Sequence, residues 1–287
     1  TKLKSIDTTN WDTSSVTRMS KTFEGCKSLE TLDLSSFNTS GVINFYHMFD
    51  GCESLVSLDL SSFKTNAITI NTNSDAMISM FEDCKSLKYL NFGNGFNTKY
   101  VQFMSSMFER CESLETLDLS SFNIQSLVGM NYMFGGCSSL VSVNLNSFNT
   151  QNVQYMIGLF RYCSSLETLD LSSFNTSSII IKYDVPGLYN MFDGCDNLRY
   201  ITLGENFFKT TLTIPFGGAP NLGVNEDGSS NGWIEHLSEI TPSTTNNVTK
   251  TIEIHPNLMG KEWATDYITI LNNKGYTITK WEQQPPV

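Results

Sequence analysis

The chain has 287 residues, with 18 Lys and Arg against 29 Asp and Glu, so its formal net charge is −11. This acidic balance argues against nucleic-acid binding, which needs clustered basic side chains to displace counterions from phosphates. Hydrophobic residues make up 40% of the chain and aromatic residues 12%, which allows a packed core and excludes wholesale disorder. Ser, Thr and Asn form roughly a third of the sequence, so uncharged hydroxyls and amides supply much of its polarity.

A repeat of about 26 residues organises the first two thirds of the chain, and its cysteines mark it. Their successive spacings are 26, 32, 27, 26, 26 and 32 residues. Phe lies three positions before each cysteine and Leu lies three positions after it. The seven positions are Cys26, Cys52, Cys84, Cys111, Cys137, Cys163 and Cys195. A unit this short cannot bury its apolar side alone, so the units are expected to stack into a solenoid.

Residues 29–54, LETLDLSSFNTSGVINFYHMFDGCES, show one complete unit. The alternating leucines at its start indicate a short strand, and the following Ser pair indicates a turn. Thr39 or Ser40 is a suitable helix N-cap. The apolar residues from Val42 to Cys52 recur at offsets 0, 3, 6, 7 and 10, which predicts one face of a helix. The unit is therefore predicted to be a strand followed by a helix.

The same pattern predicts eight parallel strands, the first at residues 3–8 and the last near Leu198. The first is weaker, with Ile6 and Thr8 in place of two leucines, and lacks a polar cap before it, so we expect the segment to begin inside a longer chain. The third and seventh units each carry about six extra residues, rich in β-branched side chains, around 67–70 and 179–183. Insertions in solenoids map to one edge and often bind partners. They are equally consistent with local strand extensions.

The period ends near residue 208. A Gly, Pro and Asn rich loop is predicted over 215–232, and a short helix follows from Trp233 to Ile240. A strand is then expected around 251–254, a helix bearing Trp263 and Tyr267, and a last strand over 276–281. Because the end of a solenoid would expose hydrophobic core residues to solvent, residues 209–287 are interpreted as a C-terminal cap, with a separate functional module as the alternative.

The repeated unit, LxxLDLSSFNTSxVxxMxxMFxxCxSL, resembles the BspA-like leucine-rich-repeat surface proteins, in particular their subgroup long catalogued as a bacterial domain of unknown function. The string SLETLDLSSFNTS recurs at 28–40 and 165–177, and KTIEIHPNLMG at 250–260 is similar to the tail that often ends such arrays. The predicted fold is therefore α/β. It is a right-handed leucine-rich-repeat-like solenoid of seven to eight strand-helix repeats over 1–208, with an α/β cap over 209–287. The resemblance implies a bacterial cell-surface or extracellular location and a role in adhesion, with no catalytic residues and no cofactor.

The cysteines are expected to be free, buried thiols, because a disulfide framework would not place one residue of an odd set at each repeat. Disulfides between neighbouring units remain the alternative. Metal binding is not expected, because the sequence has neither CxxC pairs nor histidines near the cysteines.

Two rows of outward side chains are the candidate ligand-binding residues on the strands. Asp33, Asp59, Asp118 and Asp170 share one row, which is expected either to close Asx turns onto the following serines or to bind cations. Tyr89 and Tyr200 interrupt a second row of Ser and Thr, and exposed aromatic rings on a hydroxyl surface suit glycans or extended peptides. Ile180 and Tyr183 complete the candidate set in the second insertion.

These features favour a non-enzymatic binding or adhesion module that recognises a host or environmental protein or glycan. Self-association through the insertions is a further expectation. The alternative hypothesis is a structural spacer or stalk that displays another domain, and an enzyme with its site in the cap is a third. No apolar run reaches the roughly 18 residues of a membrane-spanning helix, so we expect no membrane insertion of this segment.

Overall fold

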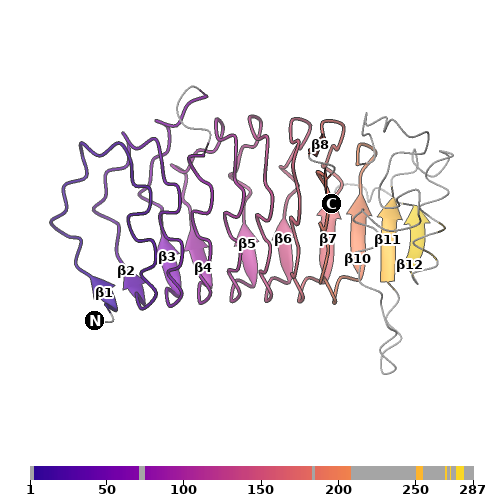
Figure 1. Cartoon of the computed structure of the whole chain (residues 1–287), viewed down its shortest axis with the longest axis horizontal. Helices are drawn as coiled ribbons and strands as arrows, with labels where there is room; N and C mark the ends of the chain where they lie inside the picture. Colours follow the sequence, from indigo (N-terminus) through magenta and orange to yellow (C-terminus); the bar gives the residue numbers. More distant parts are fainter. Residues whose placement is uncertain are drawn as a thin grey trace, which may run out of the picture.

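The computed structural model describes residues 3–70, 75–182, 185–207, 250–254 and 276–280, together with Thr269 and Asn272. Consecutive repeats form coils that stack side by side along the long axis of the molecule (Figure 1). We number them coil 1 (3–28), coil 2 (29–54), coil 3 (55–86), coil 4 (87–113), coil 5 (114–139), coil 6 (140–165), coil 7 (166–197) and coil 8 (198–207). A solenoid of strand-bearing repeats is thereby confirmed. No helix in the described part of the chain is long and apolar enough to cross a bilayer.

Each coil contributes one short strand to the same side of the stack (Figure 1). The strands are β1 (Ser5–Ile6), β2 (Thr31–Leu32), β3 (Ser57–Asp59), β4 (Tyr89–Asn91), β5 (Thr116–Asp118), β6 (Ser142–Asn144), β7 (Thr168–Leu171) and β10 (Tyr200–Leu203). β1 pairs with β2, β3 with β4, β5 with β6 and β7 with β10, all in parallel and in the register of the repeat. The eight predicted strands are confirmed.

Two further strands extend this ladder beyond the repeats. β11 (Lys250–Ile254) pairs in parallel with β10, and β12 (Tyr276–Lys280) pairs in parallel with β11. Both predicted C-terminal strands are therefore confirmed, and they continue the solenoid sheet. Thr269 and Asn272 are helical, whereas the predicted loop over 215–232 and the helix near Trp233 lie outside the described residues. The boundary between 208 and 209 stays a prediction.

The predicted helix of each repeat is wrong, and a row of tight turns takes its place. In coil 2 the amides of Met48 and Cys52 donate to carbonyls three residues earlier, at 3.0 and 3.1 Å. The alternate amides of Phe45 and Phe49 donate to coil 3 instead, at 2.8 and 2.9 Å. An α-helix would direct every amide to the residue four positions earlier in its own coil. Here about half of the amides donate to carbonyls of a neighbouring coil. Residues 42–52 and the equivalent segments of the other coils therefore form a second hydrogen-bonded ladder, which we call the turn ladder.

Left-handed backbone conformations make these turns possible. In the turn ladder of coils 1–7, two residues per coil, four positions apart, have positive φ: Lys21 and Gly25, His47 and Gly51, Ser79 and Asp83, Ser106 and Arg110, Tyr132 and Gly136, Gly158 and Tyr162, Asn190 and Gly194. Such residues break an α-helix. Glycine directly before the cysteine in four coils was the available sequence signal, because glycine adopts positive φ without steric cost. Turns repeated every four residues also return apolar side chains to one side, which explains why the spacing imitated a helix.

Identical side chains stack in columns inside the solenoid. The rings of Phe23, Phe49, Phe81, Phe108, Phe134, Phe160 and Phe192 form one continuous stack, with centroids 5.4 to 5.9 Å apart and planes within 9° of parallel. Beside it, all seven cysteines are free, as predicted, and six are buried. The Cys111 thiol donates to the carbonyl of Phe81 in the preceding coil at 3.2 Å, and five other thiols repeat this contact. The thiols are therefore structural hydrogen-bond donors as well as apolar filling.

Threonine bridges hold the corner that follows the strand at five junctions between coils. Thr98 Oγ1 donates to the carbonyl of Asn123 at 3.0 Å and accepts from the Asn123 amide at 2.8 Å. Equivalent pairs join Thr13 to Asn38, Thr39 to Lys64, Thr65 to Asn97 and Thr150 to Asn175. Each hydroxyl thus satisfies both backbone groups of a residue in the next coil.

The second insertion forms an antiparallel hairpin, β8 (Ile181–Lys182) with β9 (Val185–Pro186), which supports the strand-extension interpretation. The Ile180 carbonyl accepts from the Gly187 amide at 3.0 Å and closes the hairpin. In the first insertion Ile68 is buried and Ile70 is exposed.

Substitution of Ser106 distinguishes the turn ladder from a helix. Ser106 has φ 56°, so Ser106→Gly should be more stable than Ser106→Ala by about 1 kcal/mol, because alanine keeps the steric cost of the left-handed conformation. Both variants remove the same hydroxyl. Urea unfolding compares them, and a more stable alanine variant, the order expected of a helix, would contradict the turn assignment.

The buried thiols should resist alkylation in the folded protein. Desolvation raises the pKa of Cys52, Cys137 and Cys195 to about 12, so these groups stay neutral at pH 8. Iodoacetamide at that pH should modify at most the half-buried Cys26 in native protein, and all seven cysteines after denaturation without reductant. Intact mass counts the adducts, and fewer than seven after denaturation would indicate disulfides.

Candidate ligand-binding surface

The outward side chains of β1–β7 and β10 form what we call the sheet face. Along β3, β5 and β6 the middle residue is buried and its two neighbours are exposed, as alternation in a strand requires. The register places Tyr89 opposite Ser57 and Tyr200 opposite Thr168, so both tyrosines lie in the predicted hydroxyl row. Tyr89 is 69% exposed, whereas Tyr200 is half-buried and its strand is covered on its other edge by β11.

Tyr89 and Tyr200 do not form one compact site. The strands of coils 5, 6 and 7 separate them, which corresponds to about 19 Å at the usual strand spacing. A ligand that touched both rings would have to be extended along the solenoid axis.

The aspartate row closes Asx turns at the ends of the strands. Asp33, Asp59, Asp118 and Asp170 each accept a hydrogen bond at 2.8 to 2.9 Å from the amide two residues later. Asn91 and Asn144 make the same contact at 3.2 and 3.1 Å. The Asx turns that we expected for this row are therefore observed, while ligand binding by its exposed oxygens stays a prediction.

The hydrogen bonds of the Asx turns also keep the row ionised. The amide and then the hydroxyl of the serine two positions on hold the pKa of Asp33, Asp59 and Asp118 below its ordinary value of 3.8. Asn91 Nδ2 further donates to Asp59 Oδ1 at 3.1 Å, so an amide separates neighbouring carboxylates at this point of the row. The sheet face is negatively charged at neutral pH.

Exposed valines flank the tyrosine row and were not identified from the sequence. Val56 is 42% exposed and Val141 is 41% exposed, at positions where other coils carry Glu30, Glu115 or Glu167. The Val56 carbonyl accepts from the Lys88 amide at 2.9 Å and from the Tyr89 amide at 3.4 Å, so Val56 and Tyr89 are neighbours on adjacent strands. In the sequence, these valines could have been identified because other repeats carry a charged residue at the same position.

The described part of the second insertion lies apart from the sheet face. The hairpin β8–β9 lies across coil 7 from β7 (Figure 1). Ile180 is half-buried at its base, and Tyr183 lies outside the described residues. The second insertion thus lies apart from the sheet face, and ligand binding by Ile180 and Tyr183 stays a prediction.

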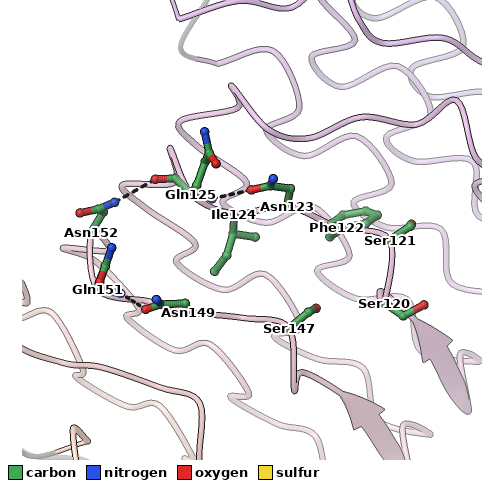
Figure 2. Close-up of a pocket in the computed structure, with 10 residues that line it drawn as sticks. All are labelled: Ser120, Ser121, Phe122, Asn123, Ile124, Gln125, Ser147, Asn149, Gln151 and Asn152. Atoms are coloured by element: carbon green, nitrogen blue, oxygen red, sulfur yellow. Dashed lines mark hydrogen bonds between the residues drawn. The ribbon is translucent and has the colours of Figure 1, made fainter.

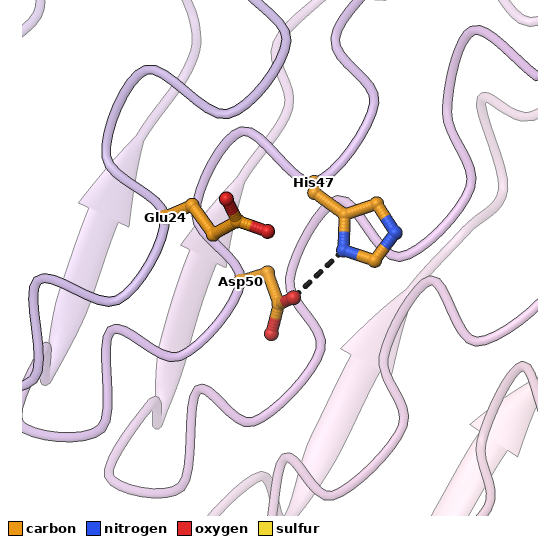
Figure 3. A group of neighbouring side chains, drawn as sticks. All are labelled: Glu24, His47 and Asp50. Atoms are coloured by element: carbon orange, nitrogen blue, oxygen red, sulfur yellow. Dashed lines mark hydrogen bonds and ion pairs between the residues drawn. The ribbon is translucent and has the colours of Figure 1, made fainter.

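A group of potential metal ligands lies on the turn ladder of coils 1 and 2. Glu24, His47 and Asp50 place their ligand atoms within 4.8 Å of one another, and Figure 3 shows the three side chains converging. His47 Nδ1 lies 2.7 Å from Asp50 Oδ2, and Lys21 Nζ lies 2.7 Å from Glu24 Oε1. Both pairs join a left-handed residue to the carboxylate three positions later, so a divalent cation would have to displace them. The sequence did not reveal this group because its members come from different coils.

Arg110 binds three carboxylates in a second acidic part of the turn ladder. Its guanidinium binds both Asp83 oxygens at 2.6 and 2.7 Å and contacts Glu82 and Glu109 at 2.9 and 3.0 Å. Hydrogen bonding from Arg110 lowers the pKa of Asp83, whereas desolvation raises the pKa of Glu109. The carboxylates around Arg110 are thus ion-paired with it, which indicates that this cluster has a structural role.

Substitutions of Asp118 test the Asx turns. Asp118→Asn should preserve the turn, as Asn91 and Asn144 do, while Asp118→Ala should reduce the free energy of unfolding by at most about 1 kcal/mol. Since the folded pKa of Asp118 is depressed, its stabilisation is present above pH 3.8 and is lost as the pH falls through the folded pKa. Thermal unfolding at pH 7 and pH 3 measures both effects. Equal melting temperatures for all three proteins at pH 7 would contradict the role of the turn.

Residues 1–88 and 75–200 match a family described as "Mycoplasma protein of unknown function, DUF285". The two overlapping matches cover coils 1–7 and the first strand residue of coil 8. No curated protein matches the chain. The family description names no activity and no ligand, and its two matches fall on the repeats whose packing is described above. The chain therefore belongs to the DUF285 family.

Proposed function

We propose that this protein is a non-enzymatic binding or adhesion module of a secreted or cell-surface protein, and that its sheet face binds an extended protein or glycan. The observation that carries the proposal is the exposure of Tyr89 on β4 beside the exposed Val56 of the preceding coil. The extracellular location and bacterial origin rest on the resemblance to BspA-like leucine-rich-repeat proteins.

The backbone of the sheet face is well suited to recognition because it is rigid before a ligand arrives. Strand pairing, the turn ladder and threonine bridges join neighbouring coils, and Asx turns fix the ends of the strands, so little backbone conformational entropy remains to be lost on binding. Tyrosine contributes a large contact area with only two side-chain torsions and retains a polar hydroxyl. Tyr89 and Val56 thus form an apolar centre, and the Ser, Thr and Asp rows surround it with polar groups, as in many interfaces.

Charge restricts the class of partner. The ionised aspartate row and the net charge of −11 repel polyanions, so a neutral or cationic ligand is favoured over nucleic acid. A host or environmental protein with exposed basic residues, or an uncharged glycan, satisfies this condition.

Arrays of extracellular-matrix proteins and glycans test this proposal with the chain and its Tyr89→Ala variant. Loss of the ring should weaken binding to the recognised component roughly tenfold or more. Tyr162→Ala is a matched control, because Tyr162 is 51% exposed but lies on the turn ladder. That variant should bind like the unmodified chain.

Two outcomes would oppose the proposal. Absence of binding throughout the arrays would favour the spacer or stalk hypothesis. Equal binding by Tyr89→Ala and the unmodified chain would show that the sheet face does not recognise the ligand through Tyr89. Circular dichroism of each variant confirms that any loss of binding is not a loss of folding.

A further inference from the structure

A groove of about 400 Å³ opens at the corner between coils 5 and 6. Ten residues line it: Ser120, Ser121, Phe122, Asn123, Ile124, Gln125, Ser147, Asn149, Gln151 and Asn152. Figure 2 shows the two corner segments side by side, with Ile124 between them. We call this the corner groove.

The corner groove lies where the threonine bridge is missing. Ile124 occupies the position of Thr98 and Thr150 and has no hydroxyl to join the next coil. The Asn149 amide donates instead to Ser147 in its own coil at 3.1 Å. At the two neighbouring junctions the equivalent amides, of Asn123 and Asn175, are both held by threonine at 2.8 Å. The groove therefore coincides with the junction at which Ile124 replaces the bridging threonine.

A second bridge is also missing here. Ser36, Ser62 and Ser173 donate their hydroxyls to carbonyls of the preceding coil at 3.0 to 3.4 Å. Ser121 in coil 5 and Ser147 in coil 6 hold the same position, but neither has such a bond to the preceding coil in the described structure, and both line the groove. Of the bridging side chains at this corner, Asn152 remains, with Nδ2 donating to the Gln125 carbonyl at 2.9 Å.

The lining has hydrogen-bonding capacity and no charge. None of the ten residues is ionisable, although the chain as a whole is acidic. Asn123 and Asn149 each use Oδ1 to accept from the amide two residues later, at 3.1 Å, which leaves their Nδ2 donors available. Exposed Gln125, Gln151 and the serine hydroxyls add donors and acceptors, and the side chains of Phe122 and Ile124 are buried beneath them.

We propose that the corner groove is a binding site for neutral saccharides. Amide and hydroxyl side chains hydrogen-bond sugar hydroxyls as donors and as acceptors. A charged ligand would find no opposite charge in the lining. The volume lies in the range of small-molecule sites, which suits one or two sugar units. This site is separate from the sheet face, so it does not depend on the function proposed above.

The Ile124→Thr variant tests the site by restoring the repeat's own residue. The new hydroxyl should bridge to Asn149, draw the coils together and close the groove. We expect saturation-transfer NMR to detect binding of at least one of glucose, galactose, mannose, N-acetylglucosamine, lactose and chitobiose to the unmodified chain. The variant should bind that sugar at least tenfold more weakly, with an unchanged or higher melting temperature.

Further variants separate this site from the sheet face. Gln151→Ala removes one exposed amide of the lining and should also weaken sugar binding, whereas Tyr89→Ala should leave it unchanged. Failure of every neutral sugar to bind the unmodified chain would overturn the proposal, as would equal binding by Ile124→Thr. Tighter binding of glucose 6-phosphate than of glucose would overturn the assignment to neutral ligands.

Discussion

The structure depends on backbone hydrogen bonds that pass from each coil to the next. A coil of about 26 residues is too short to satisfy its own buried amides and carbonyls, and unpaired buried groups are costly. The strand ladder satisfies them on one side of the coil, and alternate amides of the turn ladder satisfy them on another. Because both ladders fix the same register, equivalent side chains lie above one another. The phenylalanine stack, the thiol column and the threonine bridges all follow from that register.

The period of the sequence was enough to predict the strands and their outward rows. Leucine alternation located all eight repeat strands, and the two C-terminal strands were also found. The segment from Val42 to Cys52 was misread because four-residue turns and helical turns both return apolar side chains to the core at offsets of three and four. What distinguishes them is the sign of φ at residues such as His47 and Gly51, and only the glycines disclose that in a sequence.

The candidate sites differ in how far the sequence could reveal them. Tyr89 was identified because it departs from a row of Ser and Thr, and Val56 departs from its row in the same way. The corner groove was not predicted, because replacing one threonine with Ile124 looks conservative until the bond it removes is known. The proximity of Glu24 and His47 was not predicted, because it depends on which residues of adjacent coils lie opposite one another. Side-chain exposure and register are thus needed in addition to composition.

The near identity of the coils has a consequence for any ligand that lies along the sheet face. A surface with translational symmetry offers several equivalent positions, and a bound chain could shift by one coil with little change in free energy. Such degeneracy raises affinity statistically but gives no defined position. Tyr89 breaks the symmetry of the Ser and Thr row on the sheet face. Its ring would therefore give a ligand that lies along this face one defined position.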